Sequence, residues 1–466
     1  MLCNGLNTLE NLGIGGGLMM NIYDRSNRKA YFVDAKSSEP VATDPNMEYI
    51  RGVPGEVMGY HIAHQRFGRL PWRELVEPSL RVCQTGFIMN KNQETLVREK
   101  WDNADESTRL KLLRNFVDPE SGKPYEAGSL LMPSEKLCNT YQLLADNGPM
   151  DFYNGTVAKM LAEDLKELGS IITRDDLDAY SAEMRLSITM PLGQDTLYAV
   201  PPVSSGSVVS HVLSILEGFN FTRADLADDE SYALTVHRIT EALKFGFARR
   251  LELRDPRSKE VIKQLNTPEY AAQQRAKIND NQALLIQYNG YIMHNTEDPY
   301  STSDTTVIAP NGDAVAATSS INSRGSFNVI GQRTGISLNI ARSRINEQHL
   351  RSQSPILLTD HEGNIRLAVA VDGESDTVEV IARILWFNED VKTAVEMPRF
   401  HNFQLTNLFN YEDGLLSNSV LSLLYNRGVR PRKIDPIMSS ACAIERNATA
   451  IYASAVDRKG GGVAGF

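Results

Sequence analysis

Long apolar runs and basic charge are both scarce in this sequence. No stretch of eighteen or more apolar residues occurs, and the first twenty residues lack the basic-then-apolar order of a signal peptide. Lys and Arg number 48 against 58 Asp and Glu, which gives a formal net charge of −10. An electrostatic grip on nucleic acid needs clustered Lys and Arg, so we expect no nucleic-acid partner. A small molecule or another protein is the expected partner.

Cysteine and histidine are sparse as well. The four cysteines are Cys3, Cys83, Cys138 and Cys442, and none belongs to a CxxC pair. Zinc-ribbon and thioredoxin-like sites are therefore excluded, while isolated buried thiols and one disulfide both remain open. Of the eight histidines only His61 and His64 are close together, and they lack further residues of the metal-ligand type. We expect neither a metal nor another cofactor.

The composition that is present is that of a large folded chain. At 466 residues, with 42% hydrophobic and 23% charged residues, the chain is long enough for a sizeable core. Apolar spacing predicts helices over 59–66, 74–84, 135–147, 157–168, 232–251 and 378–387. It predicts strands over 18–20, 31–33, 186–200, 305–308, 314–321, 356–358, 365–371 and 449–456. This alternation indicates an α+β fold without a linker that would split the chain.

A glycine run lies near the start of the chain, in Gly13-Ile14-Gly15-Gly16-Gly17. It lacks the GK[ST] ending of a phosphate-binding loop. Glycine permits tight turns and close approach of two backbones, so we interpret the run as one of these.

The segment from Thr302 to Ser320 predicts a hairpin. Pro310-Asn311-Gly312 suits a three-residue loop, because proline presets the first turn position and glycine takes the left-handed one. With that loop Ala309 faces Asp313, and the register places Thr302 opposite Ser320. Two hydroxyls would then point to one side of the sheet. From the residues alone, both an edge hairpin without chemistry and a nucleophile remain open.

Seven segments spread from end to end carry a family resemblance. They are LGIGGGLMMNIYD at 12–24, VPGEVMGYHIAHQRFGRLPW at 53–72, FYNGTV at 152–157, YALTVHRITEALKFGFARR at 232–250, NGDAVAATSSIN at 311–322, AVEMPRFHN at 394–402 and DRKGGGVAGF at the terminus. In this order they resemble the γ-glutamyltransferase (glutathione hydrolase) family of N-terminal-nucleophile hydrolases. The resemblance implies a four-layered αββα sandwich. It also implies self-cleavage into two segments, residues 1–301 and residues 302–466, that interleave in one domain as a heterodimer.

The resemblance assigns roles to individual residues. Thr302 matches the threonine that becomes the nucleophile, and a threonine hydroxyl needs a base within reach. Ser320 matches a second threonine that supports it, and Gly373 matches the first glycine of the oxyanion hole. Asn322 and Ser352 match residues that contact the glutamyl group. The implied substrate of an active protein is a small γ-glutamyl peptide such as glutathione.

Several matched positions depart from the family pattern. Lys36 replaces the arginine that clamps the substrate carboxylate, so the bidentate fork is lost. Arg351 replaces the first serine of a pair. Ala341 and Arg344 fall where the family holds the substrate ammonium with acidic or amide groups. The positive charge of Arg344 would repel that ammonium.

The oxyanion position and the residue after the nucleophile differ too. The family's double glycine appears as Gly373-Glu374, and a carboxylate opposes a developing oxyanion. Asp304 replaces a histidine. We therefore expect a protein that is weakened or inactive towards glutathione. An active threonine-nucleophile hydrolase or transferase, a secreted non-catalytic effector like those of parasitoid wasp venoms, and an enzyme for a more anionic ligand remain alternatives.

Location is expected from the family, which is extracellular. Relatives carry a signal or anchor segment before the stretch that matches the start of this chain, so we expect such a segment to be missing here. Asn-x-Ser/Thr sequons at Asn154, Asn220 and Asn447 are candidate glycosylation sites and permit secretion.

Overall fold

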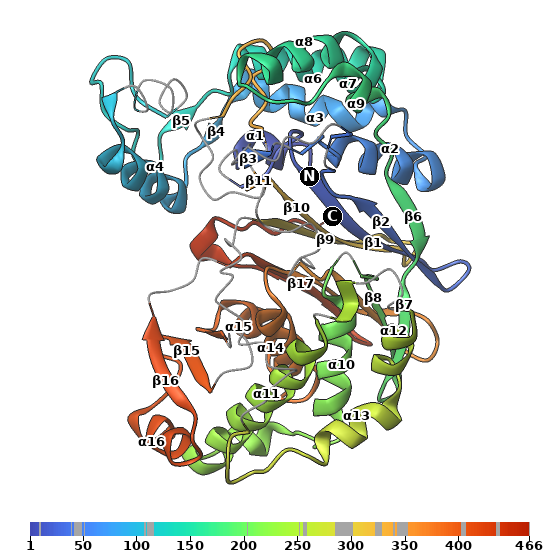
Figure 1. Cartoon of the computed structure of the whole chain (residues 1–466), viewed down its shortest axis with the longest axis vertical. Coiled ribbons are helices and arrows are strands. Elements are labelled where there is room, and N and C mark those ends of the chain that lie inside the picture. The colour runs from blue at the N-terminus through green and yellow to red at the C-terminus, as the bar shows by residue number, and fades with distance from the viewer. Residues whose placement is uncertain are drawn as a thin grey trace.

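The computed structural model describes most of the chain. The described residues are 1–8, 11–38, 40–41, 49–50, 52–106, 109, 116–202, 204–250, 252–254, 259–284, 302–321, 329–338, 341–342, 353–401, 407–434 and 439–465. Four layers are visible in Figure 1: helices, two stacked sheets, and helices again. The expected αββα sandwich is confirmed.

The first sheet has five antiparallel strands. In spatial order they are β6 (Glu183–Leu186), β2 (Lys29–Ala35), β1 (Gly17–Asp24), β10 (Ala314–Ser320) and β9 (Ser303–Ile308). The central strand β1 is buried at six consecutive positions because the sheet is covered on both faces. Strands from before and after residue 302 therefore share this sheet.

The second sheet has six antiparallel strands. In spatial order they are β18 (Ile451–Ala455), β17 (Ala441–Arg446), β13 (Ile365–Val371), β12 (Ile356–Thr359), β8 (Asp195–Ala199) and β7 (Ile188–Leu192). The prediction of one strand over 186–200 was wrong. Gly193 adopts a left-handed φ of 60°, which turns the chain between β7 and β8.

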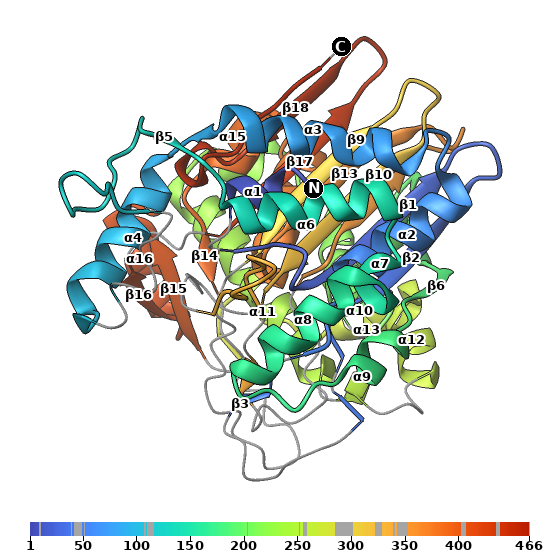
Figure 2. The same ribbon diagram turned by 90° about the horizontal axis from the view of Figure 1, so that it is seen from above.

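Helices cover the outer face of each sheet. Above the first sheet lie α2 (Glu56–Phe67), α3 (Trp72–Thr85), α6 (Glu135–Asn147), α7 (Asp151–Asn154), α8 (Thr156–Glu167) and α9 (Arg174–Asp178), which cross the strands in the view from above (Figure 2). Below the second sheet lie α10 (Gly206–Glu217), α11 (Asp229–Arg250), α12 (Lys259–Leu265), α13 (Pro268–Arg275), α14 (Glu374–Leu385) and α15 (Val391–Glu396). The predicted helices over 135–147 and 157–168 are confirmed, whereas the one predicted from 378 begins four residues earlier.

Smaller elements complete the molecule. They are α1 (Asn4–Asn7), β3 (Tyr49–Ile50), β4 (Phe87–Ile88), α4 (Lys91–Asn103), β5 (Leu130–Leu131), η1 (Arg223–Leu226), η2 (Glu252–Arg254), β11 (Ala341–Arg342), β14 (Phe400–His401), β15 (Leu408–Glu412), α16 (Asn418–Asn426), β16 (Arg430–Ile434) and η3 (Asp457–Lys459). Strands β14, β15 and β16 form a small sheet beside the sandwich, together with α16 (Figure 2).

Apolar side chains pack both within and between the layers. A cluster that includes Leu137 and Leu161 packs the upper helices against one another, and one that includes Leu18 packs α2 on the first sheet. Val212 and Leu243 belong to a larger cluster under the second sheet. Tyr23, Leu357 and other residues of a further cluster fill the space between the two sheets. Removal of this apolar area from water is the main force that holds the layers together.

One disulfide reinforces the upper layer. Cys83 in α3 and Cys138 in α6 are bonded, with their Cα atoms 5.8 Å apart. The open choice between thiols and a disulfide is thereby settled, because Cys3 and Cys442 are free. No helix among the described residues is long and apolar enough to cross a membrane.

Candidate active site at the start of strand β9

The hairpin β9–β10 has the predicted loop and register. The Ala309 amide donates to the Asp313 carbonyl at 2.8 Å, and Gly312 adopts a left-handed φ of 87°. The ladder ends at the pair Ser303 and Ser319, so the next step places Thr302 opposite Ser320. Residue 302 therefore lies at the end of the first sheet, directly before the first residue of β9.

Thr302 is buried, and its hydroxyl has a partner that the sequence did not indicate. The side chain is only 2% exposed, and Thr302 Oγ1 lies 3.0 Å from Ser440 Oγ. The Ser440 hydroxyl in turn donates to Asp304 Oδ2. Ser440 directly precedes β17, which belongs to the other sheet, so the contact bridges the two sheets. No local signal could have found it, because 138 residues separate the two hydroxyls.

The glycine run allows the start of β1 to lie close to the backbones of the neighbouring strands. A Cβ added to Gly16 would collide with the carbonyl oxygen of Ser320, and one added to Gly17 would lie 2.9 Å from the Cα of Lys36. The interpretation as a close backbone contact is confirmed. The contacts also place Lys36, which is exposed, at the same end of the sheet as Thr302 and Ser320.

A buried carboxylate of α2 lies against this end of the first sheet. Glu56, at the start of α2, is fully buried and accepts hydrogen bonds from Ser319 and Tyr60. Burial raises the pKa of Glu56, although both donors oppose the shift. Nothing in the sequence singles out Glu56, because one acidic residue at the start of a helix is an ordinary feature.

Gly373 and Glu374 form the beginning of helix α14. Gly373 has a φ of 104°, which favours glycine, whereas Glu374 is the first helical residue. Glu374 is 5% exposed and lies 3.3 Å from Arg250 (Glu374 Oε1 to Arg250 Nε). The Asp372 amide donates to the Ser440 carbonyl at 3.0 Å, so Ser440 connects this turn to Thr302.

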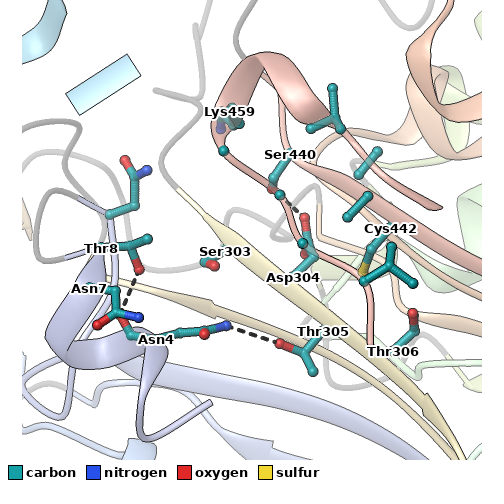
Figure 3. Close-up of a pocket in the computed structure, with 18 of the residues that line it drawn as sticks. Asn4, Asn7, Thr8, Ser303, Asp304, Thr305, Thr306, Ser440, Cys442 and Lys459 are labelled. Carbon is teal, nitrogen blue, oxygen red and sulfur yellow. Dashed lines mark hydrogen bonds between the residues drawn. The ribbon is translucent and has the colours of Figure 1, made fainter. Parts of the chain in front are cut away.

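A cavity of about 600 Å³ opens beside Thr302. Its wall combines β9 and the start of β17 with α1 and the terminal glycines, and Figure 3 shows Asn4, Asp304, Ser440 and Lys459 around it. Thr302 lines the cavity, but Lys36, Ser320, Gly373 and Glu374 do not. Of the other predicted positions, Ala341 pairs with Ile50 in a two-stranded ladder. Asn322, Arg344, Arg351 and Ser352 lie outside the described residues.

Two ionisable groups, Asp304 and His401, have strongly shifted pKa values. Burial raises the pKa of Asp304 to about 6, against the opposing effects of Ser440, Thr318, Lys459 and Arg399. His401 lies 2.9 Å from Asp376 (Nδ1 to Oδ1), and both side chains are fully buried. Burial lowers the pKa of His401, but the carboxylates of Asp376 and Glu412 outweigh burial and raise it to about 9.

Two further features bear on the predicted chemistry. Among the described residues, no group of three or more His, Cys, Asp or Glu is arranged to hold a metal ion. The sequon residues Asn154, Asn220 and Asn447 are all solvent-exposed, as a modified asparagine must be.

Comparison with known proteins gives matches along the whole chain. The family model described as gamma-glutamyltranspeptidase matches residues 1–466. Scoloptoxin SSD14 of Scolopendra dehaani is 30% identical, over 100% of this chain and 87% of the relative. Glutathione hydrolase 5 proenzyme of Mus musculus is 28% identical over the same shares. The structure of cephalosporin acylase from Bacillus halodurans superposes with a TM-score of 0.83 at 18% identity, covering 99% of this chain and 89% of that one, which supports the fold.

Proposed function

Because the chain belongs to the γ-glutamyltranspeptidase family, we propose that it is a γ-glutamyltransferase-like protein that is weakened or inactive towards glutathione. The observation that carries the proposal is the start of α14, where a buried carboxylate, Glu374, follows Gly373. In acyl transfer the developing oxyanion is stabilised by N–H donors, and a carboxylate beside it opposes its negative charge. Arg250 offsets part of the negative charge at Glu374 but adds no N–H donor to the backbone.

The proposal rests secondly on weakened binding of the glutamyl group. Lys36 offers one ammonium where a guanidinium would bind a carboxylate with two parallel hydrogen bonds. Arg344 and Arg351 add positive charge at positions that the family uses for neutral or acidic groups. A free amino acid end carries its own ammonium, and these cations repel it.

Self-cleavage is proposed to survive the loss of turnover. The scissile bond joins Ser301 to Thr302, and the attacking group is the Thr302 hydroxyl. The products 1–301 and 302–466 would remain one particle, because each of the two large sheets contains strands from both products. Separating them would expose the apolar surfaces between the layers.

A secreted non-catalytic effector is the second candidate function. It is favoured by the 30% identity to a scoloptoxin along the full chain. Exposure of Asn154, Asn220 and Asn447 is compatible with glycosylation on a secretory route. The third candidate is an active γ-glutamyl hydrolase or transferase with glutathione as its substrate.

An assay with a γ-glutamyl anilide separates these functions. The purified, folded protein is expected to release the aniline from this substrate no faster than its Thr302→Ala variant does. Turnover that disappears in Thr302→Ala would instead establish an active enzyme. Restoring the family residue types together tests the cause of inactivity, and the combined variant is Lys36→Arg, Ala341→Glu, Arg344→Asp, Arg351→Ser and Glu374→Gly. A gain of turnover in that variant is the expected result.

A further inference from the structure

The self-cleavage proposed above, on which the following proposal rests, needs a base for the Thr302 hydroxyl. In the uncut chain the nitrogen of Thr302 belongs to a peptide bond, and an amide nitrogen accepts no proton at neutral pH. A threonine hydroxyl is a weak nucleophile until a group within reach takes its proton. The uncut chain therefore needs a base other than its own amine.

Three side chains at the wall of the cavity form a chain of hydrogen bonds. Thr302 Oγ1 lies 3.0 Å from Ser440 Oγ, and Ser440 donates to Asp304 Oδ2, the bond drawn in Figure 3. An ionised carboxylate only accepts hydrogen bonds, so the Ser440 proton points to Asp304. The Ser440 oxygen is then left to accept from Thr302. This direction draws the proton away from the Thr302 hydroxyl.

We infer that Asp304, acting through Ser440, is the base for cleavage before Thr302. Thr302 Oγ1 bonds to the carbonyl carbon of Ser301 while its proton passes to Ser440 Oγ and the Ser440 proton passes to Asp304. The C–N bond then breaks, and the Asp304 carboxyl gives the proton to the departing nitrogen of Thr302. Water hydrolyses the resulting ester, which frees the carboxylate of Ser301 and the hydroxyl of Thr302.

The surroundings of Asp304 suit this role. One carboxylate oxygen, Oδ1, is buried, although the residue as a whole keeps some exposed surface. Burial raises the pKa of Asp304 to about 6. A base with such a pKa is ionised at neutral pH and still basic enough to take a proton.

The groups around Asp304 affect its pKa and therefore the pH dependence of cleavage. They are Thr318 on β10, Ser440 directly before β17, Cys442 on β17, Arg399 before β14, and Lys459 in η3. Arg399 and Lys459 lower the pKa of Asp304, but burial outweighs them. Burial raises the pKa of the Cys442 thiol, so this thiol stays neutral through the range in which Asp304 titrates. The rate of cleavage should therefore rise with pH through about 6 and then level off.

The test follows the full-length chain after cell-free synthesis at several pH values, with cleavage read on a denaturing gel. For the wild type we expect a rate about tenfold lower at pH 5 than at pH 8, as for one group with a pKa near 6. Asp304→Asn should cleave about 100-fold more slowly and without this pH dependence. Ser440→Ala should behave similarly, and Ser440→Thr, which restores a hydroxyl, should recover the rate.

A matched control is Asp313→Asn, which removes a carboxylate from the same hairpin but not from the chain of hydrogen bonds. It should cleave as the wild type does. Near-ultraviolet circular dichroism checks that each variant is folded. If Asp304→Asn and Ser440→Ala are cut at the wild-type rate and pH dependence, the relay is refuted while self-cleavage stands. A folded wild type that stays uncut at every pH refutes self-cleavage and the relay with it.

Discussion

The two ends of the candidate site, the β9–β10 hairpin and the start of α14, are built differently. At the hairpin end, backbone contacts fix the geometry, because the ladder sets the register of Thr302 and Gly16 packs against the Ser320 carbonyl. At the helix end, buried charges hold the structure, with Asp376 and His401 2.9 Å apart. Backbone geometry tolerates many side-chain changes, whereas a charge network depends on every member. A single substitution is therefore expected to cost more stability at the helix end than at the hairpin end.

Breaking the charge network should have the largest effect. Asp376→Asn leaves His401 buried without its nearest carboxylate, and loss of one partner of a buried ion pair costs about 3–5 kcal/mol. For a chain of this length we expect the melting temperature to fall by about 3–5 °C in calorimetry. Asp146→Asn is the matched control, because its ion pair with Arg73 is exposed and should contribute about 1 kcal/mol or less.

The pH dependence of stability checks the cause of that loss. Binding to Asp376 and Glu412 raises the pKa of His401 to about 9 in the folded protein, despite burial, against about 6.5 when unfolded. A pKa that is raised in the folded state increases the free energy of unfolding, and the full increase is present below the pKa of the unfolded state. This contribution of His401 is therefore lost as the pH rises from about 6.5 through 9. The wild-type melting temperature should decline across this window more steeply than that of Asp376→Asn. Equal slopes would assign the alkaline loss to other groups.

A change at the hairpin end should have a smaller effect that does not depend on pH. Gly16→Ala forces a methyl group against the Ser320 carbonyl, and relief requires a backbone shift. We expect a loss of about 1–3 kcal/mol in urea unfolding. Gly462→Ala is the control, because no atom lies within 4 Å of its added Cβ. Similar values for the two variants would mean that the strand end is not tightly held.

Local patterns made the hairpin end predictable. Proline and glycine at fixed turn positions fix the loop length, and the loop length fixes which residues face each other. The same kind of reasoning failed over 186–200, because the alternating pattern does not reveal the left-handed turn at Gly193 that separates β7 from β8. Turn conformation there depends on how β7 and β8 pack into the second sheet.

Contacts between residues far apart in the sequence could not be predicted from sequence patterns. Ser440 meets Thr302 only because the two sheets stack, and the pairing of Cys83 with Cys138 requires α3 and α6 to be neighbours. The resemblance to the family supplied candidate positions but not their partners. The resemblance identifies Asp304 only as a replaced histidine, whereas the structure shows that it accepts a hydrogen bond from Ser440.

The smallest expected effect is that of Glu374→Gln, at the first turn of α14. Glutamine keeps the shape of the side chain, and Arg250, whose side chain is 19% exposed, stays partly hydrated when the ion pair is lost. We therefore expect a loss of about 1 kcal/mol, seen as a shift of about 1 °C in calorimetry. A loss as large as that of Asp376→Asn would make Glu374 a member of the buried network. A small loss would mean that the fold does not require a carboxylate at this position.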